Sequence, residues 1–216
     1  MLADTNPEPS SRWGAGSLIV ISAPSGAGKT SLVKAVVSAM NGVVCSVSHT
    51  TRPERPGEQD GVDYHFVSPS EFDACLRNGD FLEYARVFDH SYGTSRQEVL
   101  RQVAANNDVI LEIDWQGARQ IRQKVLDCVS VFILPPSREE LERRLRGRGQ
   151  DEERVIARRL ADARSDMSHY AEFDFLVIND DFQKAVDTVC SIIVAARTRT
   201  LHQAQRQSAL LQSLLA

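Results

Sequence analysis

The chain has 216 residues, 42% of them hydrophobic, and its 25 Lys and Arg against 29 Asp and Glu give a net charge of −4. This length and apolar content suit one core with inserted lobes, and the lack of a basic excess argues against a nucleic-acid-binding protein. The sequence has no apolar window of membrane-spanning length, no signal-peptide core near its start, and four widely separated cysteines, so we expect a cytoplasmic protein that does not bind membranes.

The first half of the chain predicts a strand and helix followed by an inserted lobe. Residues 1–16 are rich in Pro, Ser and Asn, which predicts a flexible leader. The elements expected next are a buried strand at 18–22, a helix at about 28–40 and a short strand at 43–47. From 49 to 96, prolines, glycines and aspartates alternate with short apolar pairs. This segment indicates a lobe of short strands with one helix near 69–78.

The second half alternates helices with strands. The expected helices cover about 95–106, 116–126, 137–146, 152–168 and 181–213. The expected strands cover 109–114, 129–134 and 175–178. Ser137 and Glu140 have the spacing of a capping box. This alternation predicts an α/β fold with a parallel sheet flanked by helices, and ligands of such sheets bind beyond the carboxyl ends of the strands.

The stretch from Leu18 to Thr30 has the order of a phosphate-binding loop: a buried strand, a glycine turn and a helix start. The strict pattern G-x-x-x-x-G-K-[ST] has Gly where this chain has Ala23, and alanine can hold an ordinary negative φ. Lys29 would reach the β- and γ-phosphates of ATP, and Thr30 would bind Mg²⁺. The residues expected at ATP here are Ala23, Pro24, Ser25, Gly26, Ala27, Gly28, Lys29 and Thr30.

Further motifs follow in a fixed order. Residues 46–64 read S-V-S-H-T-T-R-P-E-R-P-G-E-Q-D-G-V-D-Y, and F-L-E-Y-A, Y-G-T, D-W-Q-G, R-G and V-I-N-D come later. Together, over about 18–180, they resemble the guanylate kinases, P-loop enzymes that transfer the γ-phosphoryl group of ATP to GMP. The resemblance implies a P-loop core with a GMP lobe and a lid, Mg²⁺ as cofactor, and dGMP as a further acceptor.

The resemblance assigns a phosphate site to the lobe. Arg52 and Arg55 match the two arginines of the family that bind the GMP phosphate, and Tyr64 and Tyr92 match its two tyrosines. Planar guanidinium groups suit a dianionic phosphate because each can form two parallel hydrogen bonds. The flanking prolines stiffen the loop, which favours a preformed site.

Glu83 matches the glutamate that reads the guanine base, and Ser48 and Thr94 match hydroxyl positions around it. Guanine offers N1–H and N2–H₂ as donors on one edge, and a carboxylate can accept both. Glu112 and Asp114 match acids near GMP and the metal, although the family usually has Asp at position 112. Whether Glu112 or Asp114 contacts Mg²⁺ through water, or GMP, stays open.

The resemblance places two lid arginines, Arg148 and Arg159, at the transferring phosphates, and we expect them to act with Lys29 and Arg52 as the catalytic groups. Arg144 would pack near adenine, and Asn179 would lie on the ATP side. No catalytic base is expected, since the GMP phosphate is already a nucleophile. The expected boundaries are 17–48, 97–137 and 160–216 for the core, 49–96 for the lobe and 138–159 for the lid.

Two alternatives remain. Guanylate-kinase-like domains also serve as protein-interaction modules, and related P-loop kinases act on phosphorylated sugars. The first would have lost cradle or GMP-site residues such as Lys29 and Arg52, and the second would have no use for Glu83 and Thr94. The sequence leaves the oligomeric state open, because the apolar residues of 197–216 can pack on the chain's own core or on a partner.

Overall fold

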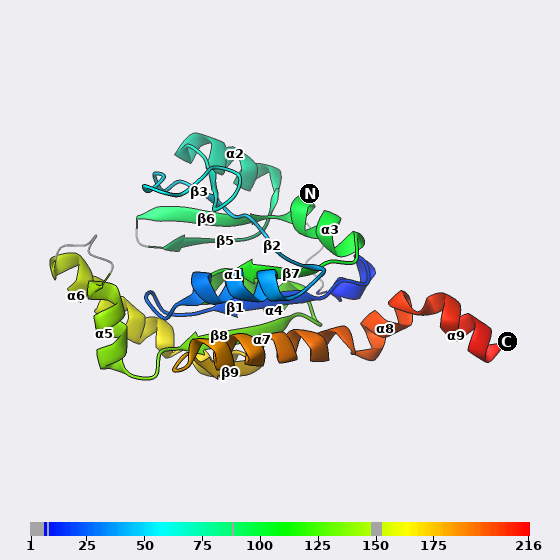
Figure 1. The fold of residues 1–216 in the computed structure, drawn as a ribbon. Coiled ribbons are helices and arrows are strands. Elements are labelled where there is room, and N and C mark those ends of the chain that lie inside the picture. Colours follow the sequence, from blue (N-terminus) through cyan, green and yellow to red (C-terminus); the bar gives the residue numbers. More distant parts are fainter. Residues whose placement is uncertain (1–6, 8, 88, 148–152) are drawn as a thin grey trace.

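The computed structural model of the protein describes residues 7, 9–87, 89–147 and 153–216. Its larger sheet is parallel and carries helices on both faces, and a smaller sheet lies above it in the view of Figure 1. The larger sheet has the order β2-β7-β1-β8-β9. Its strands are β1 (Leu18–Ser22), β2 (Val43–Cys45), β7 (Asp108–Glu112), β8 (Val129–Leu134) and β9 (Phe175–Ile178). The predicted α/β fold is confirmed.

Two layers of apolar side chains hold the helices to this sheet. Ile19 and Ile21 of β1 point to one face and pack with helices α1 (Lys29–Ala39) and α7 (Phe182–Arg197). Leu18 and Val20 point to the other face and pack with α3 (Arg96–Ala104) and α4 (Trp115–Lys124). The central strand is therefore apolar at every one of these positions because both of its faces are buried.

The lobe has the predicted short strands and single helix. Its sheet has the order β4-β3-β6-β5. Its elements are β3 (His49–Thr50), β4 (His65–Phe66), α2 (Pro69–Asn78), β5 (Phe81–Val87) and β6 (His90–Ser95). Helix α2 begins where Ser68 and Glu71 form a full capping box with Pro in the first turn. The sequence signal at Pro69 therefore marked a real helix start.

Helices α5 (Arg138–Arg146) and α6 (Glu153–Met167) form a two-helix unit with its own small core of Leu141, Leu145, Ile156 and Ala163. Helix α6 continues to Met167, past the lid end expected at 159. The predicted capping box at Ser137 is only half formed: its side chain accepts the Glu140 N–H at 3.1 Å. The Glu140 carboxylate accepts instead from Arg143 and Arg144, whose guanidinium groups are stronger donors. Arg148 lies outside the described residues.

The two ends of the described chain differ from expectation. Residues 9–16 are not a free leader: the 3₁₀ helix η1 (Ser10–Arg12) is packed, with Ser10 fully buried and its N–H donating to Asp127. The carbonyl of Ala15 accepts from Arg206 at 3.0 Å. These two hydrogen bonds tie this segment to Asp127 and to Arg206 of the body.

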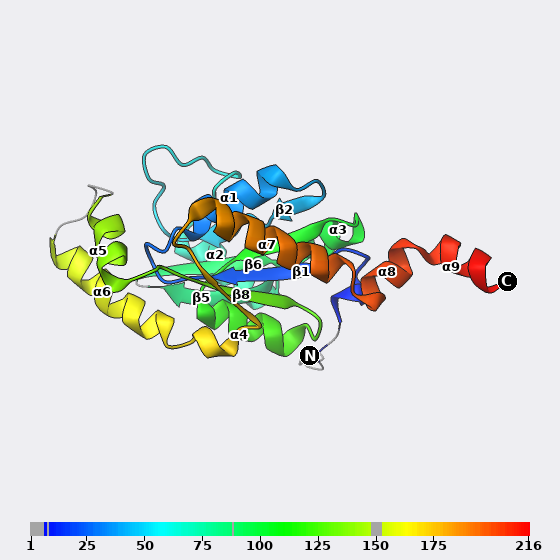
Figure 2. The ribbon, with the colours of Figure 1, turned by 60° about the horizontal axis from the view of Figure 1, so that its bottom comes forward.

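The single helix expected over 181–213 is divided into α7, α8 (Thr200–Arg206) and α9 (Ser208–Leu215). Helix α8 packs on the body through the buried His202, whereas α9 projects away from it (Figures 1 and 2). A second 3₁₀ helix, η2 (Tyr170–Glu172), precedes β9. Within the described ranges, none of the helices combines the length and the apolar character needed to cross a membrane.

Candidate active site

The glycine turn after β1 has the backbone that a phosphate cradle needs. Gly26 and Gly28 have φ of 91° and 93°, values that side-chain-bearing residues rarely adopt. A Cβ at Gly28 would also lie 2.6 Å from the Asn179 amide nitrogen. Among the described residues other than glycine, Asn106 alone has a positive φ, so Ala23 keeps the ordinary negative φ expected of it. The presence of Ala23, where the strict loop pattern has glycine, therefore leaves the turn intact.

Lys29 and Thr30 begin helix α1 and join the turn to the end of β7. The Lys29 ammonium donates to the Ile113 carbonyl at 2.9 Å, across 84 positions of sequence. The Thr30 hydroxyl donates to the Glu112 carboxylate. Since the helix N-terminus adds positive dipole charge here, the turn favours the binding of an anion, and the Glu112 carboxylate lies beside it.

Ala27, Arg144 and Asn179 support the turn from behind. The Ala27 carbonyl accepts from the Asn179 amide at 2.8 Å and from the Arg144 guanidinium at 3.2 Å. Arg144 also donates to the Asn179 carbonyl at 3.0 Å. These hydrogen bonds join the loop to α5 and to the end of β9. The expected contacts of Arg144 and Asn179 with ATP stay predictions.

Arg52 is held in place before any ligand binds. Its side chain is 8% exposed, and its guanidinium donates to the Pro53 carbonyl at 2.7 Å and pairs with Glu58 at 2.8 Å. The second Glu58 oxygen accepts the Arg55 N–H at 2.9 Å. Sequence reasoning missed Glu58 as a positioning residue, although it lies in the same loop motif.

Two tyrosines lie beside Arg52. The Tyr64 ring is 5.3 Å from the Arg52 guanidinium carbon and 6.0 Å from the Tyr92 ring. Burial, followed by the negative charge of Glu112, raises the pKa of Tyr64 to about 12. The phenol therefore keeps its proton at neutral pH and can donate it to a phosphate oxygen.

Glu83 is the most deeply buried acid of the cleft, at 2% exposure. Thr94 donates to its carboxylate at 2.5 Å. Burial, with a further contribution from the charge of Asp114, raises the pKa of Glu83 to about 7 despite that hydrogen bond. A Cβ at Gly117 would lie 2.2 Å from the other Glu83 oxygen. The site thus fits a ligand that brings its own donors to this carboxylate.

Asp114 caps helix α4 rather than ending the strand, because β7 stops at Glu112. Its carboxylate accepts from the Gly117 N–H and from the Gln116 amide, both at 2.9 Å. Helix α4 therefore begins directly beside Glu83, and the cap fixes Asp114 at the carboxyl end of the sheet.

A cleft of about 440 Å³ brings most of the predicted residues together at the carboxyl ends of the strands. The predicted residues that line it are Ala23, Pro24, Ser25, Gly26, Gly28, Lys29, Thr30, Ser48, Arg52, Arg55, Tyr64, Glu83, Tyr92, Glu112, Asp114 and Arg159. Those that do not line it are Ala27, Thr94, Arg144 and Asn179. Thr94 donates a hydrogen bond to the cleft residue Glu83, and the other three hydrogen-bond to one another behind the loop.

The cleft also contains residues that sequence reasoning did not select. They are Ala85, Val87, His90, Ile113, Val155, Arg158 and Asp166. Alternation along β5 places Ala85 and Val87 on the same face as Glu83, which is a signal that strand periodicity offered. Burial raises the pKa of Asp166 to about 6, with Asp114 and Asp162 adding to the rise. Nothing local in the sequence separated Asp166 from the many other charges of its helix.

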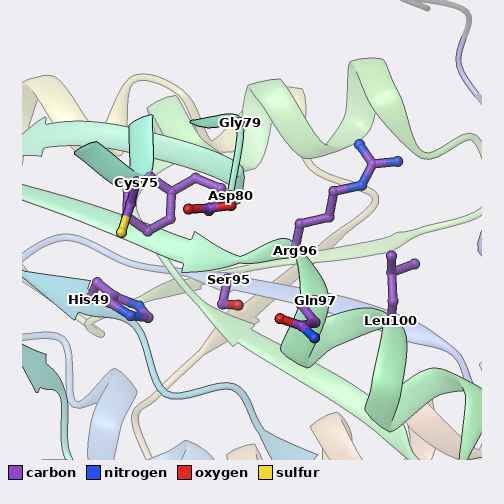
Figure 3. A pocket seen from close by; sticks show the side chains of 9 residues that line it. His49, Cys75, Gly79, Asp80, Ser95, Arg96, Gln97 and Leu100 are labelled. Carbon is purple, nitrogen blue, oxygen red and sulfur yellow. The ribbon is translucent and has the colours of Figure 1, made fainter. Parts of the chain in front are cut away.

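A second cavity, of about 450 Å³, lies between the lobe and the first turns of helix α3, and none of the predicted site residues lines it. Figure 3 shows its side chains, among them His49, Cys75, Asp80 and Ser95. Ser95 follows Thr94 in β6 and therefore points to the opposite face of the lobe sheet, and His49 follows Ser48 at the start of β3. This cavity is therefore separate from the cleft that holds the phosphate loop.

Comparison with known proteins gives a single family. The guanylate kinase family model matches residues 15–196. The chain is 56% identical to the guanylate kinase of Nitrosococcus oceani, over 93% of this chain and 98% of that one. It is 58% identical to the guanylate kinase of Alkalilimnicola ehrlichii, over 93% of this chain and 97% of that one. A crystal structure of guanylate kinase from Anaplasma phagocytophilum matches with a TM-score of 0.71 at 34% identity, over 87% of this chain and 89% of that one. The chain belongs to the guanylate kinase family.

Proposed function

We propose that this enzyme transfers the γ-phosphoryl group of ATP to GMP, giving ADP and GDP, through the residues of the cleft described above. The observation that carries the assignment is the position of Glu83. A buried carboxylate shaped to accept donors shares one cleft with the phosphate loop of Lys29 and Thr30. Arg52 and Tyr64 lie in the same cleft and can hold a phosphate.

In this arrangement the two nucleotides approach from separate elements. Guanine donates N1–H and N2–H₂ to Glu83, while Arg52, Arg55 and the two tyrosines bind the GMP phosphate. The same set of contacts suits dGMP. Lys29 and the backbone N–H groups of the loop bind the ATP phosphates. The GMP phosphate is a nucleophile at neutral pH, so positioning and charge neutralisation provide the catalysis.

The oxygen donors beside the loop suit Mg²⁺. Thr30 and Glu112 share a hydrogen bond, and hydroxyl and carboxylate oxygens are the ligands that this ion prefers. These two residues would hold it, with Asp114 acting through water. When bound, the ion neutralises charge on the β- and γ-phosphates.

Arg159 of α6 lines the cleft and would stabilise the charge of the transferring group. Arg148 would act with it, as the family resemblance implies. The two alternative functions are not favoured. Curated relatives at 53–58% identity carry the name guanylate kinase, and the chain keeps Lys29, Arg52 and Glu83 in one cleft.

A coupled assay of ADP formation tests the proposal. ATP and Mg²⁺ are supplied with GMP, with AMP, with UMP, or with no acceptor. We expect rapid ADP formation with GMP, a rate lower by orders of magnitude with AMP or UMP, and none without an acceptor. Glu83→Gln is the matched variant, since it keeps the shape of the side chain and removes its charge. Equal rates with GMP and AMP would exclude a guanine site, and ADP formation without an acceptor would indicate a simple ATPase.

A further inference from the structure

The two-helix unit of α5 and α6 is held against the body at its two ends. Helix α5 lies on the phosphate loop, where a Cβ at Gly26 would meet Leu145 at 2.9 Å. The last turns of α6 lie on the start of α4, where the Trp115 indole N–H donates to the Asp166 carboxylate at 3.2 Å. Helix α5 and helix α6 therefore each have a contact that fixes their position relative to the cleft.

The indole of Trp115 is itself firmly held. Its ring stacks on His169 with the ring centres 3.6 Å apart and 11° between the planes. The Arg119 guanidinium lies 4.9 Å from the indole centre. Glu172 joins these neighbours, accepting from Arg119 at 2.5 Å and contacting His169 at 2.7 Å. Trp115 is thus a rigid point of attachment, one residue after Asp114.

Helical spacing connects this attachment to the cleft. Asp166 follows Arg159 by seven positions, which is about two turns, so both side chains lie on one face of α6. Both residues line the cleft. A rotation or shift of α6 at Asp166 therefore moves the Arg159 guanidinium, and displacements of about 1 Å at a reacting group are costly to rate.

We propose that Asp166 is a positioning residue for phosphoryl transfer: by accepting the Trp115 indole N–H, it fixes the face of α6 that presents Arg159 to the cleft. This inference rests on the proposed function, because it takes Arg159 to act on the transferring group. In this role Asp166 acts on Arg159 indirectly, through Trp115 and the helix.

Four variants test the contact through kcat, KM for GMP and melting temperature. Asp166→Ala removes the acceptor and should lower kcat about tenfold, with KM for GMP within about twofold of wild type. Asp166→Asn keeps an oxygen acceptor and should retain most of the activity. Trp115→Phe keeps the ring on His169 without the N–H and should reproduce the loss. The double variant Asp166→Ala/Trp115→Phe should be no worse than either single change.

Asp162→Ala is the matched control, one turn earlier on the same helix, with its side chain 45% exposed and facing Arg158. It should leave kcat unchanged. Trp13→Phe leaves Trp115 as the single tryptophan, because the chain has two. In that background, a non-hydrolysable ATP analogue with GMP should change the indole emission, and Asp166→Ala should remove the change.

The outcomes separate the two levels of the proposal. Wild type without GMP kinase activity would overturn the proposed function itself. If wild type is active but Asp166→Ala behaves like Asp162→Ala, or if the losses of the double variant simply multiply, Asp166 has no positioning role. Should Asp166→Ala fail to fold, Trp115→Phe alone decides, and a wild-type kcat in that variant overturns the inference.

Discussion

Replacing Glu83 by Gln should stabilise the ligand-free protein while it damages GMP turnover. The carboxylate is 2% exposed, and its pKa is raised from the ordinary 4.5 to about 7, chiefly by burial. Because the folded state binds the Glu83 proton more tightly than the unfolded state, the charged form costs stability. That cost is absent below pH 4.5, grows between pH 4.5 and 7, and is constant above.

The difference between the two pKa values corresponds to about 3 kcal/mol at pH 8. Gln has nearly the same shape and no charge, so it removes this cost. We expect Glu83→Gln to raise the free energy of unfolding by up to about 3 kcal/mol at pH 8 and by little near pH 4.5. For a chain of this length, the gain at pH 8 corresponds to a rise in melting temperature of about 6–12 °C.

The activity should change in the opposite direction. Gln offers a donor where guanine also brings a donor, so kcat/KM for GMP should fall roughly 10²-fold or more. AMP lacks the N2 amino group and has a lone pair at N1, so its low rate should stay low or rise slightly. The ratio of the two acceptors should therefore shrink.

Urea unfolding from pH 5 to 8 and paired kcat/KM measurements for GMP and AMP check both halves. Glu54→Gln, an exposed glutamate of the same lobe, is the control for the unfolding series. A stability difference that does not grow with pH would show that Glu83 is not desolvated. An unchanged GMP:AMP ratio would show that Glu83 does not read the base.

Four other outcomes are expected. Lys29→Ala should abolish transfer and leave GMP affinity in calorimetry nearly unchanged; a large loss of affinity in the folded variant would contradict separate nucleotide sites. Arg159→Ala should lower kcat roughly 10²-fold or more in steady-state assays, whereas a pure KM effect would make it a binding group. Gly117→Ala should lower kcat/KM for GMP at least about tenfold, because its Cβ would lie 2.2 Å from a Glu83 oxygen; normal turnover would mean that the carboxylate has room to move. GMP binding at pH 6.5 should release a proton from Glu83, because the donors of guanine lower the raised pKa of this carboxyl group. Calorimetry in buffers of different ionisation enthalpy should show this release in wild type and not in Glu83→Gln.

The sequence alone determined the features that are encoded locally. The phosphate loop lies within one continuous segment, so spacing and the glycines at 26 and 28 predicted its backbone. Apolar runs without polar interruption predicted the parallel strands, of which β1 is buried at every position, whereas three of the four residues of β9 are exposed. Pro69 marked the start of α2. Family motifs then identified Glu83 and Arg52 as candidates, and both line the cleft.

The tertiary structure decided what depends on contacts between distant segments. Only packing shows that Thr94 donates a hydrogen bond to Glu83 and that Arg144 donates one to the Ala27 carbonyl of the loop. The contact of Lys29 with Ile113 spans 84 positions, and that of Trp115 with Asp166 spans 51. Spacing along a chain determines which residues share one face of a helix or strand. The partners of a residue in other elements, and how deeply it is buried, are decided only when the elements pack together. The raised pKa of Glu83 depends on that burial.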